Sequence, residues 1–350
     1  MSNLFRPLVL GSMTLPNRVI MAPLTRARAG EERIPNDLMA QYYSQRAQAG
    51  LIITEATSVT PMGVGYANTP GIWSNEQVEG WKKITRVVHD KGGRIFLQLW
   101  HVGRISHPMF LKGEIPVAPS AIKPKGHVSL VRPAIEYVTP RALDTSEISL
   151  IVQAYKKGAQ NAMMAGFDGV EIHGANGYLL DQFLQDGTNH RTDHYGGSIE
   201  NRARLMLEVT DAVISVWGAD RVGVHLAPRG DAHDMNDSNP LATFGYLVRQ
   251  LENRKIAFIF LREYQGPDSI GPQLKKLYTG VLIANEKFTK LSGEKAIEEG
   301  IADAVSFGLP FISNPDLPRR FLEGAPLNET DVKTLYGNGA VGYTDYSFYY

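Results

Sequence analysis

The feature that most constrains the fold is a series of eight short apolar runs, most of them bounded by glycine, proline or aspartate. Each run is followed by a stretch in which apolar residues recur at helical spacing. Most runs lack polar and apolar alternation, which is typical of parallel strands covered on both faces. The runs are residues 17–24, 51–59, 93–101, 169–174, 221–227, 255–262, 280–285 and 302–308.

The stretches between the runs carry helix signals. Asp144 followed by Glu147 is a variant of the capping box, and behind it apolar residues from Ile148 to Ala162 mark one buried stripe. A second amphipathic stretch follows Ser74 and ends at Gly92. The order of elements is therefore strand and helix in alternation.

Eight strand-helix units in 350 residues predict an α/β fold, a single (β/α)8 TIM barrel in which residues 1–350 form one domain. The alternative is a doubly wound open sheet. That fold needs fewer strands and usually has a glycine-rich turn after its first strand, whereas the first run here ends in Ala22-Pro23-Leu24-Thr25.

Three stretches fall outside the repeat. Residues 8–15 predict a β-hairpin around Gly11-Ser12, which we expect to cover the bottom of the barrel. Residues 102–143 form a long excursion after the third strand and contain six prolines, a length more typical of functional additions than of plain connections. Residues 229–239 are polar and rich in glycine and aspartate.

Composition and charge exclude several classes of function. The 36 basic and 36 acidic residues leave no net charge to attract nucleic acid or an anionic membrane. The absence of cysteine excludes disulfides, iron-sulfur clusters and thiol nucleophiles. No signal peptide pattern or apolar span is apparent, so we expect a soluble, cytoplasmic protein. We further expect a monomer or homodimer that binds neither nucleic acid nor membrane.

Polar residues gather where the runs end, and in barrels of this kind the active site lies at the C-terminal ends of the strands. The residues concerned are Thr25, Glu55 to Thr57, Gln98, Trp100, His101, His173, Asn176, His225, Arg262, Glu263, Asn285 and Gly308. Packing alone does not account for so many polar groups in apolar strands, because each must find a partner.

The fourth run ends in the most informative group. His173 and Asn176 could direct two hydrogen-bond donors at one oxygen atom and so polarise a carbonyl. The phenol of Tyr178 could act as a general acid. The same residues are also consistent with a purely structural role, in which His173 and Asn176 only form hydrogen bonds with the backbone of the loop.

Two other chemistries have weaker support. A metal site is not expected, because the first strand lacks a His-x-His pair and the eight-residue spacing of His225 and His233 is not that of metal ligands. A Schiff-base aldolase would need a buried lysine at a strand end, but the sixth run ends in Arg262.

Several positions are suited to a bound cofactor. Gln98 lies inside an apolar run, where its amide could pair with a flavin pyrimidine edge or with neighbouring backbone. The ends of the last two runs, Asn285-Glu286-Lys287 and Gly308-Leu309, occupy the place where barrels commonly bind a phosphate.

Together these motifs resemble the Old Yellow Enzyme family of FMN-dependent ene-reductases. The similarity covers almost the whole chain. The matching segments include residues 4–8, 16–18, 21–26, 98–104, 116–120, 171–178, 186–197, 311–317 and 342–346.

The resemblance implies a barrel that binds one FMN noncovalently and uses NADPH or NADH as the reductant. It implies that Pro23, Thr25, Ala56 and Gln98 contact the flavin ring, and that Asn285, Lys287, Gly308 and Leu309 lie near its phosphate. His173 and Asn176 would bind the substrate carbonyl, Tyr178 would donate a proton to the α-carbon, and Trp100 and Tyr343 would shape the pocket. The expected reaction is ping-pong reduction of activated alkenes such as enones, maleimides and nitroalkenes.

Two positions depart from the family pattern. His225 stands where many members have an arginine facing the flavin N1/O2 edge, and Leu309 stands where many have a phosphate-binding arginine. We hypothesise that FMN still binds with rearranged phosphate contacts, to which Lys287 contributes. The alternatives are a flavin-free barrel lyase or aldolase and a catalytically idle flavin-binding protein.

Overall fold

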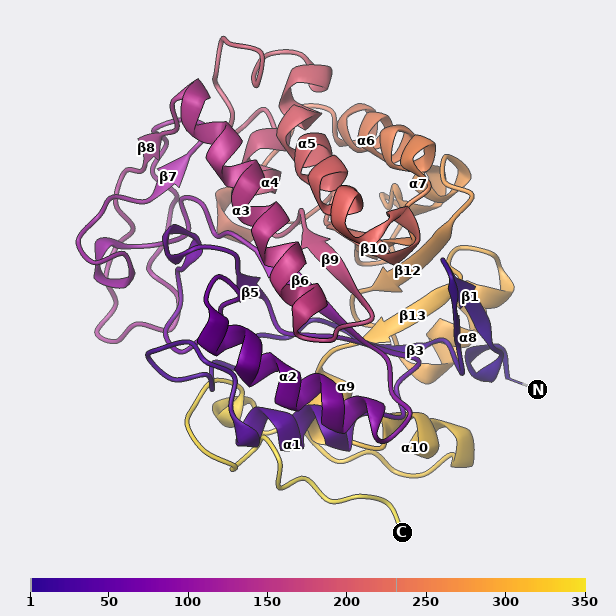
Figure 1. The fold of residues 1–350 in the computed structure, drawn as a ribbon. Helices are drawn as coiled ribbons and strands as arrows, with labels where there is room; N and C mark the ends of the chain where they lie inside the picture. The colour runs from indigo at the N-terminus through magenta and orange to yellow at the C-terminus, as the bar shows by residue number, and fades with distance from the viewer. Residues whose placement is uncertain (1, 231) are drawn as a thin grey trace.

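A computed structural model describes residues 2–230 and 232–350, and in it eight parallel strands close into a barrel surrounded by helices (Figure 1). The prediction of a closed barrel is confirmed, and the open sheet was the wrong alternative. Pairing of β4 with β6 completes the ring. The barrel strands are β3 (Val19–Met21), β4 (Leu51–Ile53), β6 (Ile95–Trp100), β9 (Gly169–His173), β10 (Val222–Leu226), β11 (Phe258–Arg262), β12 (Val281–Asn285) and β13 (Ala304–Phe307).

The helices cover the outside of this ring. Both predicted helix starts are confirmed: the Glu147 carboxylate accepts the Asp144 N–H at 2.8 Å, and Ser74 and Gln77 form a capping box. The helices are α1 (Asp37–Gln45), α2 (Asn75–His89), α3 (Thr145–Met164), α4 (Leu179–Leu184), α5 (Ile199–Trp217), α6 (Pro240–Arg254), α7 (Gly271–Lys276), α8 (Lys290–Glu298), α9 (Leu309–Ser313) and α10 (Leu317–Glu323). Within the described ranges, none of them combines the length and apolar character needed to cross a bilayer.

Each predicted run contains one barrel strand, but the second run is interrupted. After β4 the chain leaves the ladder and returns only for the two-residue strand β5 (Thr57–Ser58). At this break the hydroxyl of Thr54 accepts the backbone N–H of Gln98 at 3.1 Å, so a side chain occupies a place in the ladder. A local side-chain bond of this kind competes with strand pairing.

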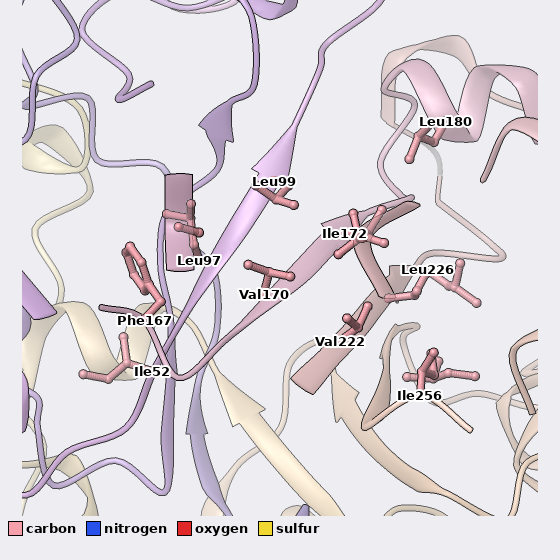
Figure 2. Close-up of a cluster of buried hydrophobic side chains, with 14 of the residues drawn as sticks. Ile52, Leu97, Leu99, Phe167, Val170, Ile172, Leu180, Val222, Leu226 and Ile256 are labelled. Atoms are coloured by element: carbon pink, nitrogen blue, oxygen red, sulfur yellow. The ribbon is translucent and has the colours of Figure 1, made fainter. Parts of the chain in front are cut away.

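The strands have two buried faces. Figure 2 shows Leu97 and Leu99 of β6 near Val170 and Ile172 of β9, within the large cluster that packs the barrel against its helices. The alternate residues point into the barrel, where a Cβ at Gly169 would lie 2.3 Å from the Phe96 ring. Gly223 leaves the same kind of space for Phe258, at 2.2 Å. Glycines in these two strands therefore make room for aromatic rings in the barrel interior.

The hairpin at the N-terminus is confirmed as antiparallel β1 (Leu8–Leu10) and β2 (Met13–Leu15). Its apolar side chains join those at the lower end of the barrel interior, including Phe258 and Ile283. The hairpin therefore covers the bottom of the barrel, as expected.

The long excursion after β6 lies at the opposite end. It contains the short parallel strands β7 (Val117–Ala118) and β8 (Arg141–Ala142). Its buried residues Val102, Ile105, Val128 and Tyr137 pack in one cluster with Ala56, Tyr66 and Trp100. The excursion therefore forms one wall above the strand ends.

Candidate active site

A cleft of about 680 Å³ opens at the C-terminal ends of the barrel strands. This is the size and position expected for a ligand site in such a barrel. Further lining comes from Phe260, Arg262, Glu286, Leu335 and Tyr336. Eight residues predicted from the sequence line the cleft: Pro23, Thr25, Asn176, His225, Asn285, Lys287, Gly308 and Leu309.

Behind His225, which lines the cleft, lies a buried polar group on three adjacent strands. The Nε2 atom of Gln98 donates to Glu171 Oε2 at 2.6 Å and lies 3.2 Å from His225 Nδ1. Because an amide nitrogen is only a donor, His225 Nδ1 is the acceptor and the imidazole proton sits on Nε2. Burial lowers the pKa of His225 well below its usual value, and burial raises the pKa of Glu171 to about 8. His225 is therefore a neutral hydrogen-bond donor facing the cleft, not a cation.

Rings stack beside this buried group, although Trp100, His173 and Tyr178 do not themselves line the cleft. His173 lies parallel to His225, with ring centroids 5.0 Å apart, and Trp100 stacks on His173 with centroids 6.4 Å apart. Tyr178 meets both Trp100 and His173 edge-on at 5.0 Å. The structure thus brings together the three residues predicted to bind and protonate a substrate, because Asn176 lies on the same turn.

Three buried nitrogens in this group have no hydrogen-bond partner in the described part of the chain. They are Trp100 Nε1, His173 Nδ1 and His225 Nε2. Burial without a partner is costly for such atoms, and most buried polar groups in proteins avoid it. Their clustering at the strand ends indicates that a ligand with polar atoms completes the site.

Asn176 is oriented by a residue whose role the sequence did not reveal. Arg262 Nη1 donates to Asn176 Oδ1 at 2.8 Å, and Arg262 Nε donates to Glu286 Oε2 at 2.6 Å. Since the carboxamide oxygen accepts from Arg262, the amide NH₂ of Asn176 is turned away from it and is free to donate elsewhere. Arg262 thereby holds Asn176 as a donor.

The loop after β12 has an unusual backbone. Glu286 and Lys287 have φ angles of 101° and 58°, in the region that favours glycine. The ammonium of Lys287 lies 4.9 Å from the centre of the Tyr264 ring, while Asn285 donates to Ser306. Gly308 and the half-exposed Leu309 complete this end of the cleft.

The adjoining wall carries Pro23 and Thr25, on the loop after β3, the strand that pairs with β13. This loop is fixed by the buried carboxylate of Glu55, whose Oε2 accepts the N–H groups of Arg26 at 3.2 Å and Ala27 at 3.3 Å. Burial raises the pKa of Glu55. Ala56 is not part of the cleft lining and packs beside Trp100 instead.

Tyr343 is also absent from the cleft lining. It is fully buried and stacks on Tyr42 with ring centroids 4.1 Å apart, and the guanidinium of Arg28 lies over its ring. The aromatic residue of the C-terminal segment that lines the cleft is Tyr336. Tyr343 supports the wall from behind.

Sequence reasoning missed several residues of this site. Arg262 was noted as a polar residue at a strand end and as evidence against an aldolase but was given no role. Glu171 was not singled out, although a charged residue inside an apolar run is a signal of special burial. Tyr66, whose hydroxyl lies 2.8 Å from that of Tyr178, belongs to an irregular loop with no pattern that marks it. No group of three or more acidic, histidine or cysteine side chains suited to a metal occurs in residues 2–230 and 232–350.

Comparison with known proteins gives consistent similarities over the whole chain. Residues 3–328 match the model of the NADH:flavin oxidoreductase / NADH oxidase family. The chain is 44% identical to a probable flavin mononucleotide-dependent alkene reductase of Leishmania infantum, over 99% of this chain and 97% of that protein. It is also 44% identical to 12-oxophytodienoate reductase 1 of Oryza sativa subsp. japonica, over 99% and 93%.

Two solved structures are similar in fold and sequence. An Old Yellow Enzyme homologue from Zymomonas mobilis superimposes with a TM-score of 0.96 at 45% identity, covering 98% of this chain and 99% of that one. Morphinone reductase in complex with tetrahydroNAD has a TM-score of 0.95 at 50% identity, covering 99% and 97%.

Proposed function

Because the chain belongs to the NADH:flavin oxidoreductase / NADH oxidase family, we propose that it is an FMN-dependent ene-reductase that reduces the C=C bond of enones, maleimides and nitroalkenes. NADPH or NADH is the reductant, and the two half-reactions alternate in a ping-pong cycle. Bound FMN would supply the hydride chemistry that links oxidation of the nicotinamide to reduction of the alkene at its β-carbon.

The observation that carries this proposal is the convergence of eight expected residues on one cleft, beside three buried nitrogens that have no partner among the described residues. Flavin offers several ring nitrogen and carbonyl acceptors, which suit the Nε2–H of His225 and a rim of polar side chains. The residues present therefore fit the cofactor. Pro23 and Thr25 in the cleft lining would hold the ring, Ala56 and Gln98 would support it from positions outside that lining, and Asn285, Lys287, Gly308 and Leu309 would hold the phosphate end.

The protein's own groups bind and protonate the alkene. His173 and the outward NH₂ of Asn176 bind the carbonyl oxygen and stabilise the negative charge that develops on it. Tyr178 donates a proton to the α-carbon. Burial raises the pKa of Tyr178 well above its usual value, so the phenol carries its proton at neutral pH. Trp100 limits the space beside the bound alkene, and Tyr343 supports the separate wall to which Tyr336 belongs.

His225 and Leu309 require adjusted cofactor contacts. A neutral His225 offers one hydrogen bond where an arginine would offer charge, and Leu309 offers no charge at all. We infer that FMN binds with rearranged phosphate contacts that include Lys287. FMN released by denaturation should be stoichiometric with protein after reconstitution, and a substoichiometric amount would contradict this inference.

An anaerobic visible spectrum tests the function. The flavin band should bleach on adding NADPH and return on adding 2-cyclohexenone. A band that NADH and NADPH fail to bleach would instead indicate a catalytically idle flavoprotein. The absence of a flavin band after incubation with FMN would favour the alternative hypothesis of a flavin-free lyase or aldolase.

We further propose that residues 1–350 form one domain and that the protein acts in the cytoplasm as a monomer or homodimer, on small molecules only. Three arginines tie the C-terminal segment to the barrel side, which supports a single domain: Arg26 donates to Leu335, Arg28 to Thr334 and Arg320 to Ser347. Size-exclusion chromatography with light scattering would decide between monomer and dimer.

A further inference from the structure

The phenol of Tyr178 begins a chain of hydrogen bonds that leads away from the cleft. Its hydroxyl lies 2.8 Å from the hydroxyl of Tyr66, which lies 3.4 Å from His233 Nε2. His233 Nδ1 lies 2.7 Å from the backbone oxygen of Asn176. Three side chains from separate loops are therefore connected in series.

The backbone carbonyl of Asn176, at the far end, determines which atom donates in each of these hydrogen bonds. A backbone oxygen only accepts, so His233 Nδ1 carries a proton and, in the neutral ring, Nε2 is an acceptor. Tyr66 then donates to His233 and accepts from Tyr178. Protonation of His233 on Nε2 reverses both bonds and turns the Tyr178 proton toward the cleft.

We propose that Tyr66 and His233 form a relay that returns a proton to Tyr178 after each turnover. This proposal rests on the proposed function, in which Tyr178 is the acid. The proton of Tyr178 passes to the substrate carbon, the proton of Tyr66 passes to Tyr178, and the Nε2 proton of protonated His233 passes to Tyr66. His233 receives a proton on Nε2 from the solvent before this transfer and is neutral again after it, so each turnover consumes one solvent proton and leaves all three side chains as they began.

The backbone brings His233 against the turn of Tyr178. Gly177 has a φ of +77°, and a Cβ there would lie 2.9 Å from the His233 Cβ and 2.7 Å from Met235 Cγ. The rings of Tyr178 and His233 lie 5.1 Å apart. Only glycine allows the two loops to approach this closely.

The surroundings of His233 disfavour its protonated form, so a proton that it receives is readily passed on. Burial lowers the pKa of His233, the bond to Asn176 raises it, and the charges of Arg104 and Arg262 lower it further. Tyr66 and Tyr178 are the other titratable groups in contact. The neighbouring Asp234 pairs with the exposed Lys125, which indicates that the outer end of the relay lies near solvent.

Stopped-flow mixing with a pH-indicator dye tests the relay. Reduced holoenzyme in weak buffer is mixed with 2-cyclohexenone, and flavin reoxidation and proton uptake are recorded together. In the parent protein the two should coincide. In Tyr66→Phe and in His233→Gln, reoxidation should proceed at the parent rate because Tyr178 still holds its proton, while uptake lags about tenfold or more behind it.

Tyr137→Phe is the matched control, since Tyr137 lies in the same aromatic cluster but its hydroxyl approaches Ser129, at 3.4 Å. It should show no lag. Simultaneous reoxidation and uptake in both test variants would overturn the relay while leaving the reductase function intact. A parent protein that is not reoxidised at all would instead refute the proposed function.

A second measurement needs no turnover. The ¹⁵N spectrum of histidine-labelled protein should identify His233 as the Nδ1–H tautomer at neutral pH, because of its bond to the Asn176 carbonyl. A proton on Nε2 in the neutral ring would remove the acceptor for Tyr66 and would also overturn the proposal.

Discussion

At the scale of single residues, Tyr178 combines burial with contacts to two aromatic rings. Tyr178→Phe removes the proton donor and keeps the ring. We expect alkene reduction to slow by about 10²- to 10⁴-fold, the usual effect of general acid catalysis, while NADPH oxidation changes less than twofold. Stopped-flow measurement of each half-reaction checks this, and an equal loss in both would contradict the assigned role.

Arg262 acts through Asn176. Arg262→Met removes the donor that orients the amide, so phenol ligands, which mimic a substrate enolate, should bind about tenfold more weakly, equivalent to the loss of one hydrogen bond of about 1.4 kcal/mol. Titration of the flavin spectrum gives the affinity.

Glu286→Gln is the control, because Glu286 contacts Arg262 on its other side and leaves the bond to Asn176 in place. A similar loss of affinity in both variants would show that the ion pair matters and the amide orientation does not.

Glu171 makes stability depend on pH. Its pKa is raised to about 8 by burial, so the folded protein holds a proton there that the unfolded chain releases near 4.5. The resulting stabilisation is complete below about pH 4.5 and is lost as the pH rises to about 8. Glu171→Gln preserves the shape of the side chain but removes its titratable group. It should therefore raise the unfolding free energy by about 1 kcal/mol or more at pH 9 and leave it nearly unchanged at pH 5.

Urea unfolding at both pH values measures the effect. An equal change at pH 5 and pH 9 would show that Glu171 acts through packing.

At the scale of elements, the strand ends and the turns that follow them decide the geometry. The turn before α4 has two successive residues at positive φ, Asn176 and Gly177. This turn directs Asn176 to the cleft and receives the loop that holds His233. No pattern in the sequence marks that contact, because it joins residues from different strand-helix units.

Gly177→Ala tests the turn. It imposes left-handed strain of about 1–2 kcal/mol and a collision with Met235 and His233, so both stability and alkene reduction should fall. Gly92→Ala is the matched control: its φ is +76° but no atom lies within 4 Å of the added Cβ. This control should lose stability only by the amount of the backbone strain and should keep full activity. Thermal unfolding and turnover distinguish the two, and equal activity in both variants would show that the close approach is unimportant.

At the scale of the whole molecule, the barrel is filled by rings that face glycines. Gly169→Ala would force a Cβ to within 2.3 Å of the Phe96 ring and should cost about 1–3 kcal/mol of stability, as overpacking does. Gly293→Ala, in helix α8, meets only ordinary contacts at 3.5 Å and should stabilise the protein by about 0.5–1 kcal/mol. Chemical unfolding compares them, and stabilisation by both would mean that the barrel interior has spare volume.

The sequence by itself determined the number and order of the strands, the bottom hairpin and eight residues of the cleft lining. Burial on both faces makes barrel strands apolar, so a polar residue such as His173 or His225 at a strand end is visible in the chain. The tertiary structure decided which of these groups meet. It joined Arg262 to Asn176, Gln98 to Glu171 and His225, and Tyr66 to Tyr178, and it placed Tyr343 behind the wall. The physical reason is that hydrogen bonds and stacking act between atoms a few ångströms apart, whereas these partners are far apart along the chain. Gln98 and Glu171 are separated by 73 positions, and Tyr66 and Tyr178 by 112.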